Sequence, residues 1–301
     1  MRRFQLPRVR LRWFLILGLI GFAFAAQKAW TNLTRPWGSQ KVAYVAAEQQ
    51  CGSSGRLRYC VYRAVGGTNG DVLYHLHGRK LDERIWNDDT YMTAMVQAQW
   101  QATGVAPPTV VTLSYGDEWL LTPRGAREES GLLEDLMSRL PEIERKTGTP
   151  ERRLLLGESM GGLNVLIAGL SEPQAFSKLA ALCPGVYADS PFGSLSSTRA
   201  AVERTGANPK MAFGIWLLAR RYLADESEWR RVSPLSLIER AQPDFPALYL
   251  STGLYDAYGN YEGTQLLAKR AAARGVRTEW RPLYGGHCAT DIASLASFLV
   301  S

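Results

Sequence analysis

The sequence predicts an α/β fold in which helices cover both faces of a mostly parallel sheet. Short apolar segments, typical of strands that are buried on both faces, recur along the chain. Longer amphipathic segments separate them. This alternation favours parallel strands, because each helix returns the chain to the starting end of the sheet. Early hairpin-like strands are expected to add an antiparallel edge.

Each expected element rests on a local pattern. The expected strands are apolar segments at residues 59–65, 72–75, 109–114, 154–156, 179–182, 247–251 and 277–281. The expected helices have polar starts, glycine ends or both. They span residues 88–103 with Asp88 and Asp89 as candidate caps, 126–147 with a bend at Pro141, 261–274 and 290–300.

Residues 189–240 interrupt the alternation of strands and helices. They contain no convincing strand, and the patterns at residues 213–221 and 234–240 are helical. A plain helical excursion between strands is one interpretation. We expect instead a helical cap insertion over the functional edge of the sheet, which we call the cap segment.

The N-terminus carries most of the net charge. The chain has 35 basic and 28 acidic residues, a formal charge of +7, and five of the arginines precede an apolar run at residues 13–26. Without these five, 30 basic residues face 28 acidic ones. The body of the chain therefore lacks the general basic surface that nucleic-acid binding requires.

This start resembles a secretory signal peptide. A basic stretch precedes 14 apolar residues, with small residues at Ala23, Ala25 and Ala26. The run is shorter than the roughly 20 residues that span a bilayer comfortably. An uncleaved membrane anchor through residues 13–30 is the alternative. We expect residues 1–26 to direct export, residues 27–40 to form a tether, and residues 41–301 to function in the periplasm or outside the cell.

The four cysteines fit an oxidising compartment. Cys51 and Cys60 flank a short Gly/Ser turn, and we expect them to form a disulfide bond after export. Cys183 and Cys288 are both expected at the functional edge of the sheet. Their pairing stays open, although a bond there would restrain the loop that carries His287.

The most informative motif is Gly-Glu-Ser-Met-Gly at residues 157–161. It follows an apolar strand and precedes a helical pattern, which is the context that a nucleophilic serine requires. The tight turn exposes the hydroxyl of Ser159, and the flanking glycines avoid steric clashes. The amides at the start of the next helix can stabilise an oxyanion. A simple tight turn would not need this combination.

A serine nucleophile needs a base within hydrogen-bonding reach. The chain has three histidines, and only His287 follows Ser159 in the sequence, as the order Ser, Asp, His requires. Asp256 follows an expected strand at its carboxyl end and is the expected orienting acid. Asp244 precedes that strand, and Asp291 is more plausible as a helix cap.

The second oxyanion donor is expected after an early strand that ends in His77 and Gly78. We expect the backbone amides of Arg79 and Met160 to form the pair. A metal site at His75 and His77 is disfavoured, because the chain offers no third ligand nearby. We therefore expect neither a metal nor a cofactor.

These motifs together resemble a known family. The chain is similar to the esterase D-type "putative esterase" branch of the α/β-hydrolases, which includes S-formylglutathione hydrolases, feruloyl and siderophore esterases, and mycolyltransferases. The resemblance covers roughly residues 55–300. The matching residues are His77–Gly78, Trp86, the Pro-Pro-Thr-Val-Val at 107–111, the Gly-Glu-Ser-Met-Gly-Gly at 157–162, Glu172–Pro173 with Phe176, Gly253 with Asp256, and Gly286–His287.

The resemblance implies the α/β-hydrolase fold and a catalytic triad of Ser159, Asp256 and His287. Residues 189–240 match nothing diagnostic, so the substrate stays open. Hydrolysis of a small-molecule or glycan-linked carboxylic ester through an acyl-enzyme is the leading hypothesis. An acyltransferase that passes the acyl group to an alcohol or sugar, and a non-catalytic binding protein, are the alternatives.

The aromatic side chains offer candidates for substrate binding. Trp86, Tyr115 and Trp119 lie near the motifs in the sequence and are expected to line the cleft. Burial in the core is the simpler alternative for side chains of this size.

Overall fold

The computed structural model describes residues 8–33, 41–121 and 131–301. The chain divides into two units, of which the first ends at Lys41 and the second begins at Val42. The first unit contains helix α1 (Arg8–Leu33), which includes the apolar run expected to direct export. The helix continues through residues 27–33, which we expected to belong to the tether, and residues 34–40 lie outside the described residues. In the described part of the chain, no helix has the length and apolar character needed to cross a membrane.

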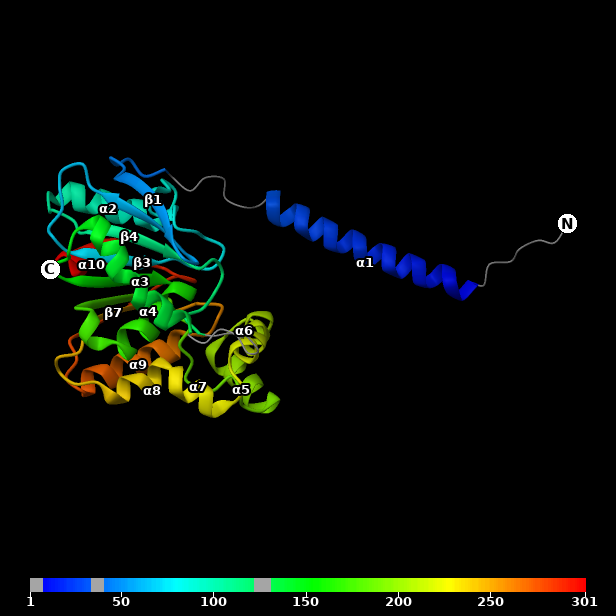
Figure 1. The fold of residues 1–301 in the computed structure, drawn as a ribbon. Coiled ribbons are helices and arrows are strands. Elements are labelled where there is room, and N and C mark those ends of the chain that lie inside the picture. Colours follow the sequence, from blue (N-terminus) through cyan, green and yellow to red (C-terminus); the bar gives the residue numbers. More distant parts are fainter. Residues whose placement is uncertain (1–7, 34–40, 122–130) are drawn as a thin grey trace. The chain divides into compact units, whose positions relative to one another are not determined.

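The second unit is built on one sheet of eight strands (Figure 1). In sheet order these are β1 (Glu48–Ser54), β2 (Leu57–Arg63), β4 (Thr109–Ser114), β3 (Val72–Leu76), β5 (Arg153–Glu158), β6 (Lys178–Leu182), β7 (Ala247–Gly253) and β8 (Thr278–Leu283). The pairs β1–β2 and β2–β4 are antiparallel, and every other pair is parallel. The predicted α/β fold, with a parallel sheet and an antiparallel edge, is confirmed.

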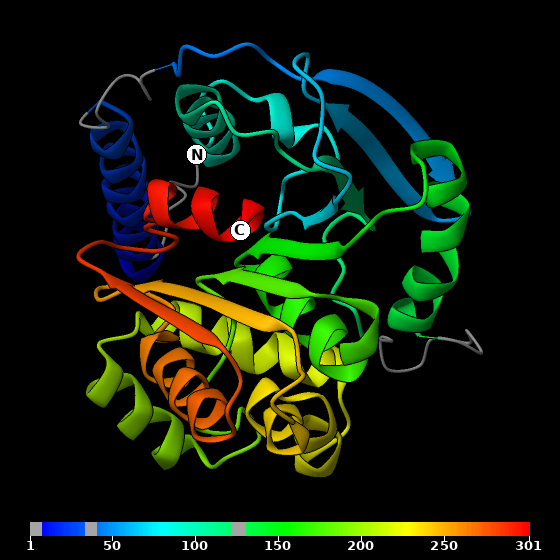
Figure 2. The same ribbon diagram turned by 90° about the vertical axis from the view of Figure 1, so that its left-hand side faces the viewer.

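Helices cover both faces of this sheet, as Figure 2 shows. The helices outside the cap segment are α2 (Met92–Thr103), α3 (Leu132–Thr147), α4 (Met160–Ser171), α9 (Tyr261–Ala273) and α10 (Ile292–Val300), with short 3₁₀ turns at Ile85–Asn87 and Pro173–Ala175. Alternate strand residues enter separate cores. Leu154 and Leu156 pack with residues of α2 and α10, whereas Leu155 packs with residues of α3, α4 and α9.

The cap segment is helical, as predicted. It contains α5 (Leu195–Thr205), α6 (Pro209–Tyr222), α7 (Glu226–Val232), α8 (Pro234–Leu237) and a 3₁₀ turn at Ile238–Arg240. Polar side chains cap the N-termini of α6 and α7. The Asn208 side chain accepts a hydrogen bond from the Lys210 amide, and Asp225 accepts one from the Glu228 amide. Helices α5 and α7 are additions to the two helices that the sequence predicted.

Several predicted boundaries differ from the structure. Helix α2 begins at Met92, because Asp88 does not cap it and instead accepts hydrogen bonds from Thr90 in a preceding turn. The start predicted for α3 falls on residues outside the described part of the chain, and the helix is described from Leu132. Asp291 caps α10 through the Ser294 amide, as expected.

The predicted disulfide bond of the edge hairpin is present. Cys51 on β1 and Cys60 on β2 are directly opposite in the antiparallel register, with 4.0 Å between their α-carbons. The strand β1 itself was not predicted, because its sequence is polar and most of its side chains are exposed.

Candidate active site

Ser159 lies on a strained turn between β5 and α4. Its backbone has φ 55° and ψ −112°, a conformation that L-residues rarely adopt, and its amide donates to the Leu182 carbonyl at 2.9 Å. Glycines are required around it. A Cβ atom on Gly161 would overlap the Leu76 carbonyl oxygen, and one on Gly157 would lie 2.5 Å from the Gly161 carbonyl carbon. The predicted strand, serine turn and helix are thus present.

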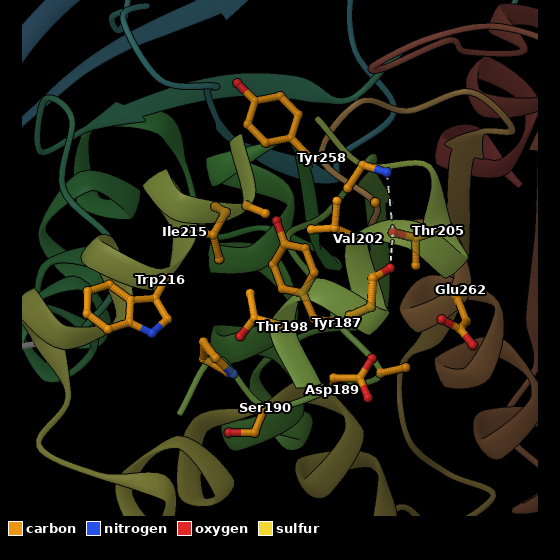
Figure 3. Close-up of a pocket in the computed structure, with 16 residues that line it drawn as sticks. Tyr187, Asp189, Ser190, Thr198, Val202, Thr205, Ile215, Trp216, Tyr258 and Glu262 are labelled. Carbon is orange, nitrogen blue, oxygen red and sulfur yellow. Dashed lines mark hydrogen bonds between the residues drawn. The ribbon is translucent and has the colours of Figure 1, made fainter. Parts of the chain in front are cut away.

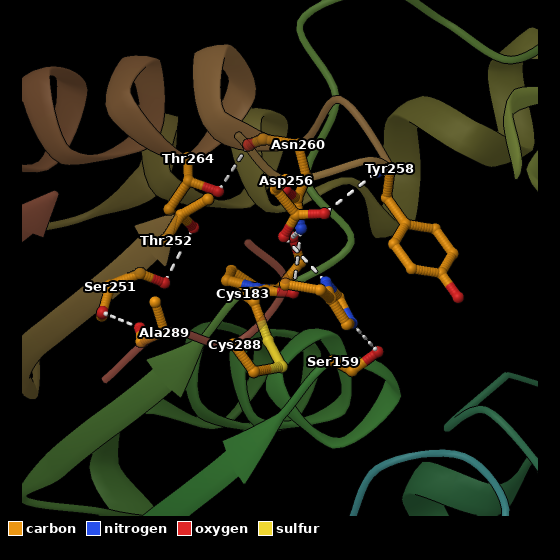
Figure 4. A network of polar contacts seen from close by, with 12 residues as sticks. Ser159, Cys183, Ser251, Thr252, Asp256, Tyr258, Asn260, Thr264, Cys288 and Ala289 are labelled. Atoms are coloured by element: carbon orange, nitrogen blue, oxygen red, sulfur yellow. Dashed lines mark hydrogen bonds and ion pairs between the residues drawn. A yellow bond between two sulfur atoms is a disulfide. The ribbon is translucent and has the colours of Figure 1, made fainter. Parts of the chain in front are cut away.

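His287 joins Ser159 to Asp256, and Figure 4 labels these two partners of the histidine. Its Nε2 lies 2.9 Å from the Ser159 Oγ, and its Nδ1 lies 2.7 Å from the Asp256 Oδ2. The carboxylate of Asp256 is buried and also accepts a hydrogen bond from the Tyr258 amide at 2.9 Å. With its Nδ1 proton donated to Asp256, the imidazole presents an unprotonated Nε2 to the serine hydroxyl.

Three strands deliver these side chains to one edge of the sheet. Ser159, Asp256 and His287 follow the carboxyl ends of β5, β7 and β8, which run in the same direction. Asp244 is exposed at the opposite, amino end of β7. The expected placement of Asp256 rather than Asp244 beside the histidine is therefore what the structure shows.

A disulfide bond ties the histidine loop to the sheet. Cys183, just after β6, pairs with Cys288, the residue that follows His287, and 4.9 Å separate their α-carbons. Asn260 holds the same segment, because its Nδ2 donates to the carbonyls of Cys183 and Pro184 at 2.9 and 3.0 Å. Within the described residues, Cys183, His287 and Cys288 form the one close group of potential metal ligands, but the two sulfurs are bonded to each other.

The two expected oxyanion donors both line the cleft that contains Ser159. Met160 is the first residue of α4, where backbone amides have no carbonyl partner within the helix. Arg79 follows Gly78 on the loop after β3. His77 Nδ1 donates to the Gly78 carbonyl at 2.8 Å, and burial lowers the pKa of His77, so this histidine adds no charge to the loop.

The cleft has a volume of about 340 Å³ and lies between the sheet edge and the cap segment. Trp119 lines it, as expected, together with Tyr187 and residues of α6. Tyr258 lies beside His287, with 4.5 Å between the two ring centroids. A smaller neighbouring cavity of about 80 Å³, shown in Figure 3, shares Tyr187, Ile215 and Tyr258 with the cleft.

The other two aromatic residues expected in the cleft lie elsewhere. Trp86 is fully buried in the core beneath α2 and packs edge-on against His75, with 5.3 Å between the ring centroids. The Tyr115 hydroxyl donates to the Asp135 carboxylate at 2.6 Å, and its ring packs on the core of the other face. Both are structural side chains, because burial of the ring stabilises the sheet and its helices.

Comparison with known proteins identifies the family. Residues 59–289 match the model of the Esterase family, described as "Putative esterase". The chain belongs to this esterase family. The match covers most of the chain and includes Ser159, Asp256 and His287, so the protein is a carboxylic ester hydrolase of the α/β-hydrolase superfamily.

Solved structures of esterases and lipases have the same fold. An S-formylglutathione hydrolase from Agrobacterium tumefaciens is 17% identical, with a TM-score of 0.56 over 86% of this chain and 95% of that chain. An esterase from Pyrobaculum calidifontis is 16% identical, with a TM-score of 0.57 over 87% of this chain and 88% of that chain. A hormone-sensitive lipase from a metagenome library is also 16% identical, with a TM-score of 0.61 over the same shares of the two chains. At these identities the likeness shows the fold alone. No curated protein matches the esterase.

A buried polar network beneath the esterase's active site was not anticipated from the sequence. The Glu158 carboxylate accepts hydrogen bonds from the Gly78 amide at 2.7 Å and from the Tyr91 hydroxyl at 3.0 Å. Its other oxygen lies 2.8 Å from His75 Nε2, and His75 Nδ1 lies 3.3 Å from the Thr112 hydroxyl. His75 is thus a structural partner of Glu158. The signal that could have revealed it is a carboxylate inside the serine motif together with a histidine, His75, in the middle of an apolar strand.

Proposed function

We propose that the esterase hydrolyses carboxylic esters through an acyl-enzyme on Ser159. The observation that carries the proposal is the pair of hydrogen bonds, 2.9 and 2.7 Å long, that link Ser159, His287 and Asp256. Such a chain activates a hydroxyl that is otherwise a weak nucleophile.

In the proposed reaction, Ser159 Oγ attacks the ester carbonyl while His287 Nε2 accepts the hydroxyl proton. The backbone amides of Arg79 and Met160 stabilise the oxyanion of the tetrahedral intermediate. His287 then returns the proton to the leaving alcohol, and the acyl group remains on Ser159. In the second step, His287 accepts a proton from a water molecule, which attacks the acyl carbonyl. The ester bond to Ser159 then breaks, His287 returns the proton to Ser159 Oγ, and the carboxylic acid is released. Asp256 keeps the imidazole oriented and stabilises its protonated form.

The test compares four variants by ester turnover and by covalent labelling with a fluorophosphonate. Ser159→Ala should abolish labelling, and both Ser159→Ala and His287→Ala should lower turnover by about 10⁴- to 10⁶-fold. Asp256→Asn should cost around 10⁴-fold, because it favours the wrong imidazole tautomer. Asp244→Asn is the matched control and should stay within a few-fold of wild type. Full activity in Ser159→Ala would refute the proposal.

The same experiment decides between hydrolysis and acyl transfer. Added alcohols or sugars compete with water for the acyl-enzyme, and product analysis distinguishes the free acid from a new ester. A panel of chromogenic esters of increasing acyl length then defines which acyl groups the cleft accepts.

We further propose that the catalytic body acts outside the cytoplasm. Five arginines precede the apolar run and are expected to stay on the cytoplasmic side. The pairing of all four cysteines in two disulfide bonds supports an oxidising compartment. Cell fractionation tests this proposal, and recovery of the esterase from the cytoplasm would contradict it. A mature N-terminus near Ala26 would indicate a cleaved signal rather than an anchor.

A further inference from the structure

The charged side chains that line the cleft beside Ser159 are cationic. They are Arg79, Lys210 and Arg221, and no described acidic residue lines the cleft with them. All three side chains are exposed, with 62% of the Arg79 side chain and 60% of the Arg221 side chain accessible to solvent. They are therefore available to a bound molecule.

Helix α6 presents two of these cations on one face. Lys210 and Arg221 are three helical turns apart, so both point to the same side of the helix, about 16 Å from each other along its axis. Gly214, Leu217 and Leu218 lie between them on this face and also line the cleft. The cap segment thus offers the active site an apolar surface with a positive charge at each end.

Nearby carboxylates offset only part of this charge. Arg221 pairs with Glu118 at 3.1 Å, and Arg79 lies 3.6 Å from Asp117. Exposed ion pairs of this kind are weak and easily exchanged for another partner. The Lys210 ammonium group makes no ion pair with any described residue.

The acidic residues of the neighbouring cavity do not supply this missing partner. Asp189 and Glu262 line the smaller cavity rather than the cleft, and both pair with Arg204 on α5. Asp256 is buried and is hydrogen-bonded to His287. Among the described residues, no carboxylate therefore compensates the positive charge of Lys210 at the cleft.

We infer that the esterase selects esters that carry an anionic group, such as a carboxylate, on an apolar acyl or alcohol part. This inference rests on the proposed hydrolysis at Ser159. The reacting carbonyl lies at Ser159 and His287, the apolar part contacts the α6 face, and the anionic group pairs with Lys210. Arg221 adds to the attraction, because its guanidinium can bind a carboxylate through two parallel hydrogen bonds.

The test uses substrate pairs that differ in one charge and are alike in size. On the acyl side, the pair is the 4-nitrophenyl monoester of suberic acid and its analogue with a terminal carboxamide. On the alcohol side, the pair is the butyrate ester of 4-(hydroxymethyl)benzoate and that of 4-(hydroxymethyl)benzamide. The readout is the ratio of kcat/KM for the anionic member to kcat/KM for the neutral member, which does not depend on the fraction of active enzyme.

The wild type should favour the anionic member of at least one pair by about tenfold at low salt. The ratio should fall several-fold in 0.5 M NaCl, because salt screens exposed charges. Lys210→Gln should lower the ratio about three- to tenfold, and Lys210→Glu should bring it below one. Lys269→Gln, which removes an exposed lysine on α9 that does not line the cleft, is the matched control and should leave the ratio at the wild-type value.

Two outcomes would overturn the inference. One is a wild-type ratio near one for both pairs. The other is a ratio that Lys210→Glu changes no more than Lys269→Gln does. In either case, turnover of the neutral esters and fluorophosphonate labelling would still stand as evidence for hydrolysis at Ser159. Absence of turnover and labelling with every ester would instead contradict the proposed function itself.

Discussion

Removal of the Cys183–Cys288 disulfide bond should lower both stability and activity, and the structure allows the two effects to be estimated. The bond closes a loop with a sequence separation of 105, whereas Cys51–Cys60 closes one of 9. By the chain-entropy relation, the longer loop contributes about 4.7 kcal/mol to the free energy of unfolding. The shorter one contributes about 2.6 kcal/mol by the same relation.

Loss of the two disulfide bonds should differ more in its effect on kcat than in its effect on stability. Cys288 follows His287 directly, so loss of the bond frees the loop that holds Nε2 at 2.9 Å from the Ser159 hydroxyl. A displacement of about 1 Å at reacting groups can cost 10²-fold in rate. The Cys183→Ala/Cys288→Ala variant should therefore lose about 10- to 100-fold in kcat. The hairpin bond between Cys51 and Cys60 lies at the far edge of the sheet, and its removal should leave kcat unchanged.

The assay combines urea denaturation without reductant and steady-state kinetics under native conditions. Both double alanine variants are compared with wild type, and the slope of the unfolding transition is checked for each. Equal losses of unfolding free energy in the two variants would refute the loop-length argument. Wild-type kcat in Cys183→Ala/Cys288→Ala would refute the role of the bond in holding His287.

Three further predictions test the support of the site and the core. Glu158→Leu should lower kcat about 100-fold with little change in KM, since leucine accepts none of the three hydrogen bonds and the Gly78 amide next to Arg79 loses its partner; steady-state kinetics measures this. Gly161→Ala should lower the free energy of unfolding by about 3 kcal/mol, because its Cβ would overlap the Leu76 carbonyl. Gly214→Ala on α6 should raise it by up to about 1 kcal/mol, because a Cβ there has no atom within 4 Å, and thermal unfolding compares the two variants. Burial lowers the pKa of Lys178 to about 8, so between pH 8 and 10.5 the unfolded chain retains a proton that the folded chain has lost, and stability rises with pH. As the pH is raised through this range, the free energy of unfolding of the wild type should increase by up to about 3 kcal/mol relative to that of Lys178→Met. Urea denaturation at several pH values measures this difference.

The parts of the fold that the sequence predicted are those with strong local patterns. Strand β4 begins and ends at the predicted residues 109 and 114, because a continuous run of buried side chains defines it. Strand β1 lacks such a run and forms through its pairing with β2, which no local pattern reveals. Aspartate often caps a helix, but the Asp88 carboxylate accepts hydrogen bonds from the amide and the hydroxyl of Thr90 in a turn before α2. Competition between local partners cannot be resolved without the folded backbone.

The candidate site divides in the same way. Ser159, Asp256 and His287 were predictable, because each follows a strand end and few histidines compete for the role of base. Of the three aromatic residues, Trp119 lines the cleft as expected, whereas Trp86 and Tyr115 do not, since residue type does not distinguish a ring packed in the core from one that lines a cleft. Lys210 and Tyr258 reach the cleft only through the packing of the cap segment and the loop after β7, which are tertiary features.

Direct contacts connect the turn that carries Ser159 with the loop after β3 that carries Gly78 and Arg79. They emerge from adjacent parallel strands, with Leu76 opposite Gly157 in the register of β3 and β5. Glu158, the neighbour of Ser159, accepts the hydrogen bond from the Gly78 amide, and Gly161 packs against the Leu76 carbonyl where no Cβ fits. A change in any of these contacts should move Ser159 relative to the Arg79 and Met160 amides, which we propose stabilise the oxyanion. The strand register therefore sets where Ser159 lies relative to the loop after β3, and the contacts of Glu158 before the serine and of Gly161 after it hold that arrangement.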